Sequence, residues 1–293
     1  MRWLTPAPQL TDPVLVVMLT GWIDAGGAAR SAADAIEDDT SASPIAEFDD
    51  DTYVDFRARR PVMELREGLN SVLNWERIML CLGRDQTGRD VLLLNGPEPD
   101  MAWHRFTRLV GAMATELGVQ HMAHLGAYPF ATPHTRPARL SITSPSQDVL
   151  MRLPFLRSSI DVPGGVAAAL EHEMHERGIP AVGIWAQVPH YIASISYPAA
   201  SVALLDGLRD ATGLVIDAAE LRSEVIVQAR RIDALVEGND EHAAMIEQLE
   251  ELYDSIDSAA GTTVAGTFGG PVLEVRSADE LGAEVEEFLR RQD

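Results

Sequence analysis

Lysine is absent from this chain of 293 residues: all 23 of its basic side chains are arginine, against 45 acidic ones. This absence excludes chemistry that depends on a lysine, such as a Schiff base with pyridoxal phosphate or the usual phosphate-binding loop. The formal net charge of −22 also opposes binding to a nucleic acid, whose phosphates are held by clustered basic residues. We therefore expect no nucleic acid partner.

Cysteine and long hydrophobic runs are also scarce. The single cysteine, Cys81, lies in an apolar run and cannot form an internal disulfide, which is typical of a reducing compartment. No segment reaches the ~18 consecutive apolar residues that a membrane span needs, and the first residues lack the apolar stretch of a secretory signal. The expected location is the cytoplasm, and no membrane partner is expected.

Short apolar runs that alternate with helical patterns fill most of the chain. Strands are predicted at residues 14–19, 44–48, 78–82, 91–94, 119–125 and 179–188, and helices up to residue 36 and at 100–117, 166–177 and 198–208. Asp100 is predicted to cap the helix that it opens. Such alternation is typical of a largely parallel sheet with helices on both faces. We therefore expect an α/β core domain over residues 1–219.

The last quarter of the chain has a different character. Apolar residues recur at helical spacing on both sides of a turn near residue 239, which predicts a helical hairpin over residues 220–258. Residues 259–293 are expected to form a strand, at 272–275, and a helix that return to the core. Residues 220–293 hold 18 acidic side chains and 6 arginines, so −12 of the net charge lies here.

The clearest candidate site is a glycine-rich turn that directly follows the first predicted strand. It contains Gly21, Trp22, Asp24 and Gly26 and opens a helix. In an open parallel sheet, ligands bind outside the carboxyl ends of the strands, and a helix N-terminus there could hold an anion. The alternative is a tight turn in which Asp24 only caps the helix.

Two further loops also follow predicted strands. Glu98 and Asp100 are presented by the proline-stiffened loop 95–100, as a general base would be, or they belong to a rigid helix start. His190 and Tyr191 come after the strand 179–188, where a histidine acts as an acid or base or serves as a hydrogen-bonded structural residue. No metal-ligand spacing and no catalytic constellation is recognisable, so no metal and no cofactor are expected.

An acidic stretch at residues 47–55 is followed by Arg57, Arg59 and Arg60. Carboxylates at this density could bind Mg²⁺ or Ca²⁺, but their spacing does not match a calcium loop. We interpret the arginines as neutralising the acids across a turn or at a contact between subunits.

Together, Gly21-Trp22-Ile23-Asp24-Ala25-Gly26, Asn95-Gly96-Pro97-Glu98-Pro99-Asp100 and Val188-Pro189-His190-Tyr191 resemble the proteasome assembly chaperone 2 family, in particular its actinobacterial branch. The resemblance covers about residues 10–215, and the acidic hairpin looks like the extension of that branch. It implies a three-layer α/β/α sandwich, similar to the phosphorylase/hydrolase-like fold, in an oligomeric protein.

From the resemblance and the missing catalytic constellation we expect a protein similar to an assembly chaperone, which self-associates and binds other proteins without catalysis. The alternative is a small-molecule-binding protein or an enzyme of the nucleoside phosphorylase/hydrolase-like fold. Its candidate ligand-binding residues are Gly21, Trp22, Asp24, Gly26, Glu98, Asp100, His190 and Tyr191. Some members of the family dock on the proteasome through a C-terminal hydrophobic-Tyr-any tripeptide, which Arg291-Gln292-Asp293 does not match.

Overall fold

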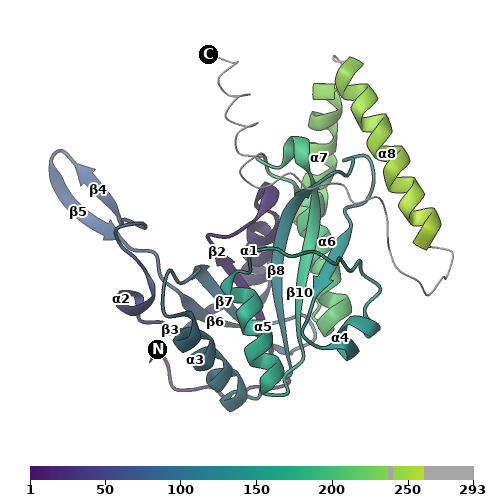
Figure 1. Ribbon diagram of the computed structural model, residues 1–293. Coiled ribbons are helices and arrows are strands. Elements are labelled where there is room, and N and C mark those ends of the chain that lie inside the picture. The colour runs from purple at the N-terminus through teal and green to yellow at the C-terminus, as the bar shows by residue number, and fades with distance from the viewer. Residues whose placement is uncertain (237–239, 261–293) are drawn as a thin grey trace. The chain divides into compact units, whose positions relative to one another are not determined.

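The computed structural model describes residues 1–236 and 240–260 (Figure 1). The chain divides into two units, Met1–Tyr253 and Asp254–Asp293, and the second is described only as far as residue 260. The predicted strand at residues 272–275 and the helix after it lie outside the described residues.

The first unit is built on a sheet of eight strands: β1 (Arg2–Trp3), β2 (Val14–Thr20), β3 (Ser43–Glu47), β6 (Met79–Arg84), β7 (Asp90–Pro97), β8 (His121–Phe130), β9 (Leu140–Thr143) and β10 (Ala181–Pro189). Their order in the sheet is β1-β3-β6-β7-β2-β8-β10-β9. The central strands β7, β2, β8 and β10 are parallel to one another, and every other neighbouring pair is antiparallel.

The sheet is therefore mixed, and the prediction of a largely parallel sheet was wrong for its outer strands. The reason is clearest for β6 and β7, which are joined by a turn at residues 85–89. A parallel pair needs a long crossover connection, whereas a connection this short permits only antiparallel pairing.

The helices are α1 (Ala28–Thr40), α2 (Asp50–Tyr53), α3 (Trp103–Glu116), α4 (Gln147–Arg152), α5 (Val166–Glu176), α6 (Pro198–Thr212), α7 (Ala219–Val236) and α8 (Asp240–Ala260). Two short 3₁₀ turns, Ala25–Gly27 and His190–Ile192, lie in the loops after β2 and β10. Helices α1 and α6 cover one face of the sheet, and α3 and α5 cover the other (Figure 1). This arrangement is the predicted three-layer α/β/α sandwich.

Strand β2 shows how the sequence produces these layers. Val14, Val16 and Met18 belong to the core beneath α1 and α6, whereas Leu15 and Val17 belong to the core beneath α3 and α5. Side chains alternate between the faces of a strand, so a strand that is covered on both sides must be apolar throughout. The continuous apolar run is the signal by which β2 is found.

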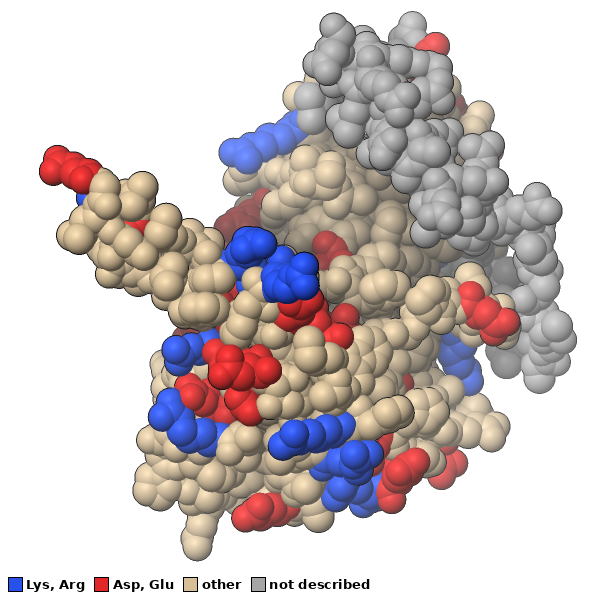
Figure 2. Space-filling model, turned by 60° about the vertical axis from the view of Figure 1, so that its left-hand side comes forward, with Lys and Arg blue, Asp and Glu red and all other residues tan. Residues whose placement is uncertain are grey.

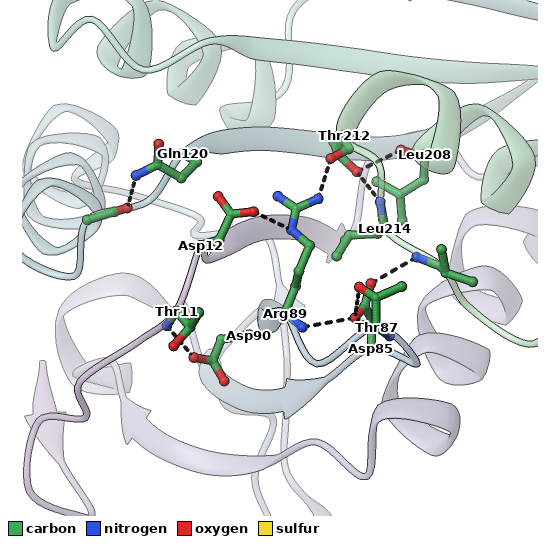
Figure 3. A network of polar contacts seen from close by, with 12 residues as sticks. Thr11, Asp12, Asp85, Thr87, Arg89, Asp90, Gln120, Leu208, Thr212 and Leu214 are labelled. Atoms are coloured by element: carbon green, nitrogen blue, oxygen red, sulfur yellow. Dashed lines mark hydrogen bonds and ion pairs between the residues drawn. The ribbon is translucent and has the colours of Figure 1, made fainter.

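The segment between α6 and α7 is fixed at the amino end of the parallel strands (Figure 3). Arg89 forms an ion pair with Asp12 (2.7 Å) and donates to the carbonyl of Thr212 at the end of α6 (2.6 Å). The buried carboxylate of Asp85 accepts hydrogen bonds from the backbone N–H groups of Thr87, Arg89 and Val215. Residues 85–89 thus hold the start of the helical extension.

A two-stranded sheet, β4 (Val62–Arg66) and β5 (Leu69–Asn74), stands clear of the main sheet (Figures 1 and 2). We call residues 62–74 the arm. All of β5 and most of β4 are exposed, so the arm packs little of its surface on its own chain. Sequence patterning did not predict it.

Candidate functional site

The loops that carry the candidate residues meet at the carboxyl edge of the parallel strands. Strands β2 and β7 end side by side, with Thr20 opposite Pro97, and the N–H of Glu98 donates to the carbonyl of Thr20 (2.6 Å). The turn after β2 also meets the loop after β10, because the N–H of Gly26 donates to the carbonyl of Ala193 (2.6 Å). Three loops from distant parts of the sequence therefore form one surface.

Asp24 caps α1, as the simpler of its two interpretations predicts. Its carboxylate accepts from the N–H groups of Ala29 (2.8 Å) and Arg30 (3.0 Å). Burial raises the pKa of Asp24 above its ordinary value, although these hydrogen bonds oppose the shift. Gly26 has a φ of 62°, and a Cβ there would lie 3.0 Å from Tyr197, so the turn requires glycine.

Glu98 caps a helix that is distant in sequence. Its carboxylate accepts from the N–H of Val166 (2.5 Å), the first residue of α5. The ring of Trp22 lies beside this contact, since a Cβ on Gly165 would be 2.9 Å from the Glu98 carboxylate and 3.3 Å from the Trp22 ring. Two helix N-termini at this edge are thus occupied by carboxylates of the chain itself, which disfavours an anionic ligand at either.

Asp100 does not cap a helix, and that prediction was wrong. The N-cap of α3 is Ala102, at a φ of 58°, without a side-chain cap. Asp100 instead accepts from the N–H of Asp55 (2.8 Å) and binds the Arg59 guanidinium through both oxygens (3.1 Å each). That guanidinium lies over Gly21, where a Cβ would come within 2.6 Å of it.

His190 and Tyr191 point to different neighbours. His190 is exposed, and its ring meets only the edge of the Tyr191 ring in the part of the chain that the structure describes. The Tyr191 hydroxyl accepts from the backbone N–H of His134 (2.8 Å) and hydrogen-bonds Nδ1 of the same residue (2.7 Å). Burial raises the pKa of Tyr191 to about 12.

Residues that the sequence did not single out connect this edge to α7 and α8. His134 also contacts Asp233 of α7 through Nε2 (3.2 Å). In α8, Glu250 pairs with Arg136 (3.1 Å), and the ring of Tyr253 lies 3.4 Å beneath the guanidinium of Arg139. In the loop after β8, His134 and Arg136 lie between Pro133 and Pro137, and Arg139 follows two residues later. This pattern is a weak signal, and only the partners of these residues in α7 and α8 show its meaning.

The structure thus brings Gly21 near Asp100 through Arg59, and Trp22 near Glu98 at Gly165, whereas Gly26 packs against Tyr197 in the loop after β10. Most of the polar groups among these five candidate residues serve the fold. Two cavities in the described part of the chain lie elsewhere: one of about 630 Å³ between α6, α7 and β9, and one of about 30 Å³ beside His134 and Tyr197. Neither is lined by these five residues. Ligand binding by the candidate residues stays a prediction.

Metal binding and membrane insertion have no support in the residues described. Among them, no three or more His, Cys, Asp or Glu side chains gather as they would around a metal ion. None of the helices within residues 1–236 and 240–260 combines the length and the hydrophobicity that crossing a bilayer requires.

The carboxyl edge also exposes apolar side chains. Large hydrophobic side chains that are 37–66% exposed follow β2, β7 and β10, end β8 or precede α5. We call them the rim: Trp22, Ile23, Met101, Phe130, Val162 and Ile195. Isolated exposed hydrophobic residues are normal, but a group of them at one edge marks a surface for another molecule.

Comparisons with known proteins identify relatives of this chain along most of its length. The family model described as "PAC2 family" matches residues 18–236. A protein of unknown function from Corynebacterium glutamicum has 30% sequence identity and a TM-score of 0.82, covering 88% of this chain and 98% of that one. A comparison with curated proteins found no match.

Two further solved structures are similar along most of their length. A proteasome-assembly chaperone homologue from Mycobacterium tuberculosis is 32% identical, with a TM-score of 0.74 over 80% of this chain and 99% of that one. A PAC2 family protein from Streptomyces avermitilis is also 32% identical, with a TM-score of 0.73 over 80% of this chain and all of that one. The chain therefore belongs to the PAC2 family, as its three loop motifs indicated.

Proposed function

We propose that this chain is an assembly factor of the chaperone type, which acts in the cytoplasm by self-association and by binding other proteins, without catalysis. Membership of the PAC2 family and the identity with a proteasome-assembly chaperone homologue support a protein partner. A small-molecule function is less favoured, because Asp24, Glu98 and Asp100 are engaged by the backbone and by Arg59.

The arm is the observation that carries this proposal. Val62 and Leu69 are each 67% exposed, and Met63, Leu65, Val72 and Leu73 are 43–52% exposed. An isolated two-stranded hairpin is only marginally stable in water, and both of its edges present unpaired backbone groups. Because so many hydrophobic residues are exposed on such an element, we infer that the arm contacts another protein surface.

Analytical ultracentrifugation of the full chain tests self-association. We expect the wild type, whose single chain has a mass of 31.9 kDa, to sediment as an oligomer at micromolar concentration. A variant with residues 62–74 replaced by a short Gly-Ser linker is expected to sediment as a monomer, slightly lighter than the full chain. Ile226→Ser removes another exposed hydrophobic side chain (58%), on α7, and serves as the matched control. A wild type that stays monomeric at every concentration would overturn the proposal.

Capture from the native host tests binding to other proteins. Tagged wild type and the linker variant are cross-linked in cells and purified under the same conditions. The expected result is a partner recovered in a fixed ratio with the wild type, and proteasome subunits are the first to look for, given the description of the M. tuberculosis relative. Recovery of the chain alone, in both cases, contradicts this part of the proposal.

A further inference from the structure

We infer that the groove between α6, α7 and β9 binds a basic amphipathic helix of a partner protein. The inference rests on the proposed binding to other proteins, and it says where a partner binds and which kind of segment it presents. It follows from the hydrophobic lining of the groove, its length, the paired edge of the sheet beside it, and the charge of the chain.

The groove has a volume of about 630 Å³, and nine of its twelve lining residues are apolar. Leu140 and Phe155 line it beside the edge of the sheet. Val225 lines it from α7, and Ala199 and Ala203 line it from α6. Phe155, Ala203 and Val225 pack on the core but are only partly buried. A hollow of this volume with a hydrophobic lining is typical of a binding site, so we expect another molecule to cover these side chains.

The groove follows one face of α6. Its lining residues on this helix recur three or four positions apart, from Ala199 to Asp210. At about 1.5 Å per residue this face is roughly 17 Å long, which is the length of about three helical turns. A partner helix seats hydrophobic residues of the same spacing in such a groove. Ala199, Ala203 and Gly207 are small, which allows the axes of two packed helices to lie close together.

The edge of the sheet beside the groove favours a helix over a strand as the bound segment. Strand β9 is the last strand of the sheet, and its outer edge is already paired. The N–H of Ile142 donates to the carbonyl of Leu156 (3.0 Å), and the N–H of Leu156 donates to the carbonyl of Leu140 (3.1 Å). A partner strand would need these backbone groups, whereas a helix satisfies its own and needs only the hydrophobic lining.

Charge determines which kind of helix fits. The groove contains two carboxylates, Asp206 and Asp210, and one guanidinium, Arg222, which binds Asp206 (2.8 Å). Asp210 is 46% exposed, and its only ion pair within the described residues is a contact of 3.4 Å with the adjacent Arg209. Its carboxylate is therefore open to a lysine or arginine of a partner. The net charge of −22 also attracts a basic segment to the chain and repels an acidic one.

The groove is separate from the arm. It lies at the β9 edge of the sheet, whereas the arm leaves the chain between α2 and β6, near the opposite edge (Figure 1). A second copy of the chain fits the groove poorly, because it carries the same net charge of −22. Binding of a partner helix and self-association can therefore be measured independently.

Fluorescence anisotropy with the full chain measures binding of a model helix. The probe is a labelled peptide of about 18 residues, long enough to form a helix, with leucine on one face and lysine on the other. A peptide of the same composition in scrambled order has the same charge but no hydrophobic face. We expect the amphipathic peptide to bind the wild type with a Kd in the micromolar range, and the scrambled peptide to bind at least about 10-fold more weakly.

Variants of the groove locate the site. Ala203→Phe fills the groove and is expected to raise the Kd of the amphipathic peptide at least about 10-fold, because the helix can no longer approach α6. Ala234→Phe, at an exposed position of α7 outside the groove, is the matched control and should leave the Kd unchanged. Thermal unfolding checks both proteins, and Ala199→Phe replaces Ala203→Phe if that variant does not fold.

Two further variants test the role of charge in the groove. Asp210→Asn is expected to raise the Kd about 2- to 5-fold, as the loss of an exposed ion pair does. Asp38→Asn removes the same charge from an exposed position of α1 and should change the Kd by less than about 2-fold. Equal effects of the two variants would show that Asp210 does not contact the bound helix.

Each other outcome has a definite meaning. If Ala203→Phe binds the peptide as the wild type does, or if the wild type binds both peptides equally, the groove is not the site. The inference then fails, while the proposed binding to other proteins still stands on the capture experiment. If Ala203→Phe lowers the subunit number in ultracentrifugation, a second copy occupies the groove and the inference is wrong. If capture recovers no partner, the proposed function fails, and the inference fails with it.

Discussion

Asp24 shows how a single side chain stabilises the carboxyl edge. Asp24→Ala removes the acceptor for two N–H groups of α1 and is expected to lower the free energy of unfolding by about 1–2 kcal/mol, as measured by urea denaturation. Asp38→Ala, at an exposed position of the same helix, is the control and should change it by less than about 0.5 kcal/mol. Equal effects would contradict the capping role.

Asp85 makes stability depend on pH. Burial alone would raise the pKa of Asp85, but its hydrogen bonds from Val215, Thr87 and Arg89 outweigh this and hold the pKa below its ordinary value. The folded state therefore binds this proton less readily than the unfolded state does. The stability that the carboxylate contributes is fully present above pH about 5 and is lost as pH falls below about 4, through the lowered folded-state pKa.

Urea denaturation from pH 7 to pH 3 measures this dependence. Asp85→Asn retains one acceptor and is expected to be less stable than the wild type by about 1–3 kcal/mol at neutral pH. The difference between the two proteins should shrink as pH falls below about 4, because protonation then weakens the wild-type contacts too. A difference that is constant over this range would show that the charge of Asp85 is unimportant.

Residues also show how far the sequence alone could lead. The capping of α1 by Asp24 was predictable because donor and acceptor lie within six residues. Glu98 caps α5, whose first residue lies 68 positions later in the sequence. Asp100 binds Arg59, 41 positions earlier, instead of capping α3. Contacts between residues so far apart depend on the tertiary fold, which the hydrophobic periodicity and the motif spacing of the sequence do not reveal.

Secondary-structure elements also differ in how well the sequence predicts them. Strands such as β2, buried on both faces, appear in the sequence as continuous apolar runs, and their positions were predicted to within a few residues. The sequence analysis did not predict the arm, because apolar and polar residues alternate along a strand only when one face is buried and the other is exposed. Both faces of β5 are exposed. The exposed hydrophobic residues of the arm fit the proposed contact with another protein surface.

Helix α5 is anchored to the sheet by a buried polar contact. Glu171 accepts from the Thr143 hydroxyl of β9 (2.8 Å) and contacts Nε2 of His124 in β8 (2.7 Å), and the side chains of Glu171 and His124 are buried. Glu171→Ala leaves the His124 ring and the Thr143 hydroxyl without this acceptor. We expect a loss of about 1–3 kcal/mol in the free energy of unfolding, because a buried donor that loses its acceptor still lacks its contacts with water.

Urea denaturation tests the anchor, with Glu176→Ala at an exposed position of α5 as the control. The control should change stability by less than about 0.5 kcal/mol. If Glu171→Ala behaves like the control, the contact between α5 and the sheet contributes nothing to stability.

Hydrogen exchange tests whether the arm is covered. The amides of β4 and β5 are expected to exchange slowly in the wild-type oligomer and faster after dilution to the monomer, because an isolated hairpin opens readily. The amides of β2, which are central in the sheet, should not change with concentration. Fast exchange in the arm at every concentration would show that no partner copy covers it.

At the scale of the whole molecule, the net charge of −22 sets how association depends on salt. Like charge on every subunit opposes assembly most strongly at low ionic strength, where the screening length is ~30 Å at 0.01 M and falls to ~8 Å at 0.15 M. The Kd of self-association is therefore expected to decrease as sodium chloride is raised over this range. An increase would mean that attractive ion pairs dominate the interface.

Charge reversal at the base of the arm sharpens this prediction. Arg57 and Arg60 are exposed, and no ion pair of either guanidinium occurs within the part of the chain that the structure describes. Arg57→Glu with Arg60→Glu changes the net charge of residues 55–77 from +1 to −3, so the arm then adds to the repulsion between copies. Ultracentrifugation should show weaker association at low salt and a difference from the wild type that narrows as salt is added, since screening removes repulsion but not burial of hydrophobic surface.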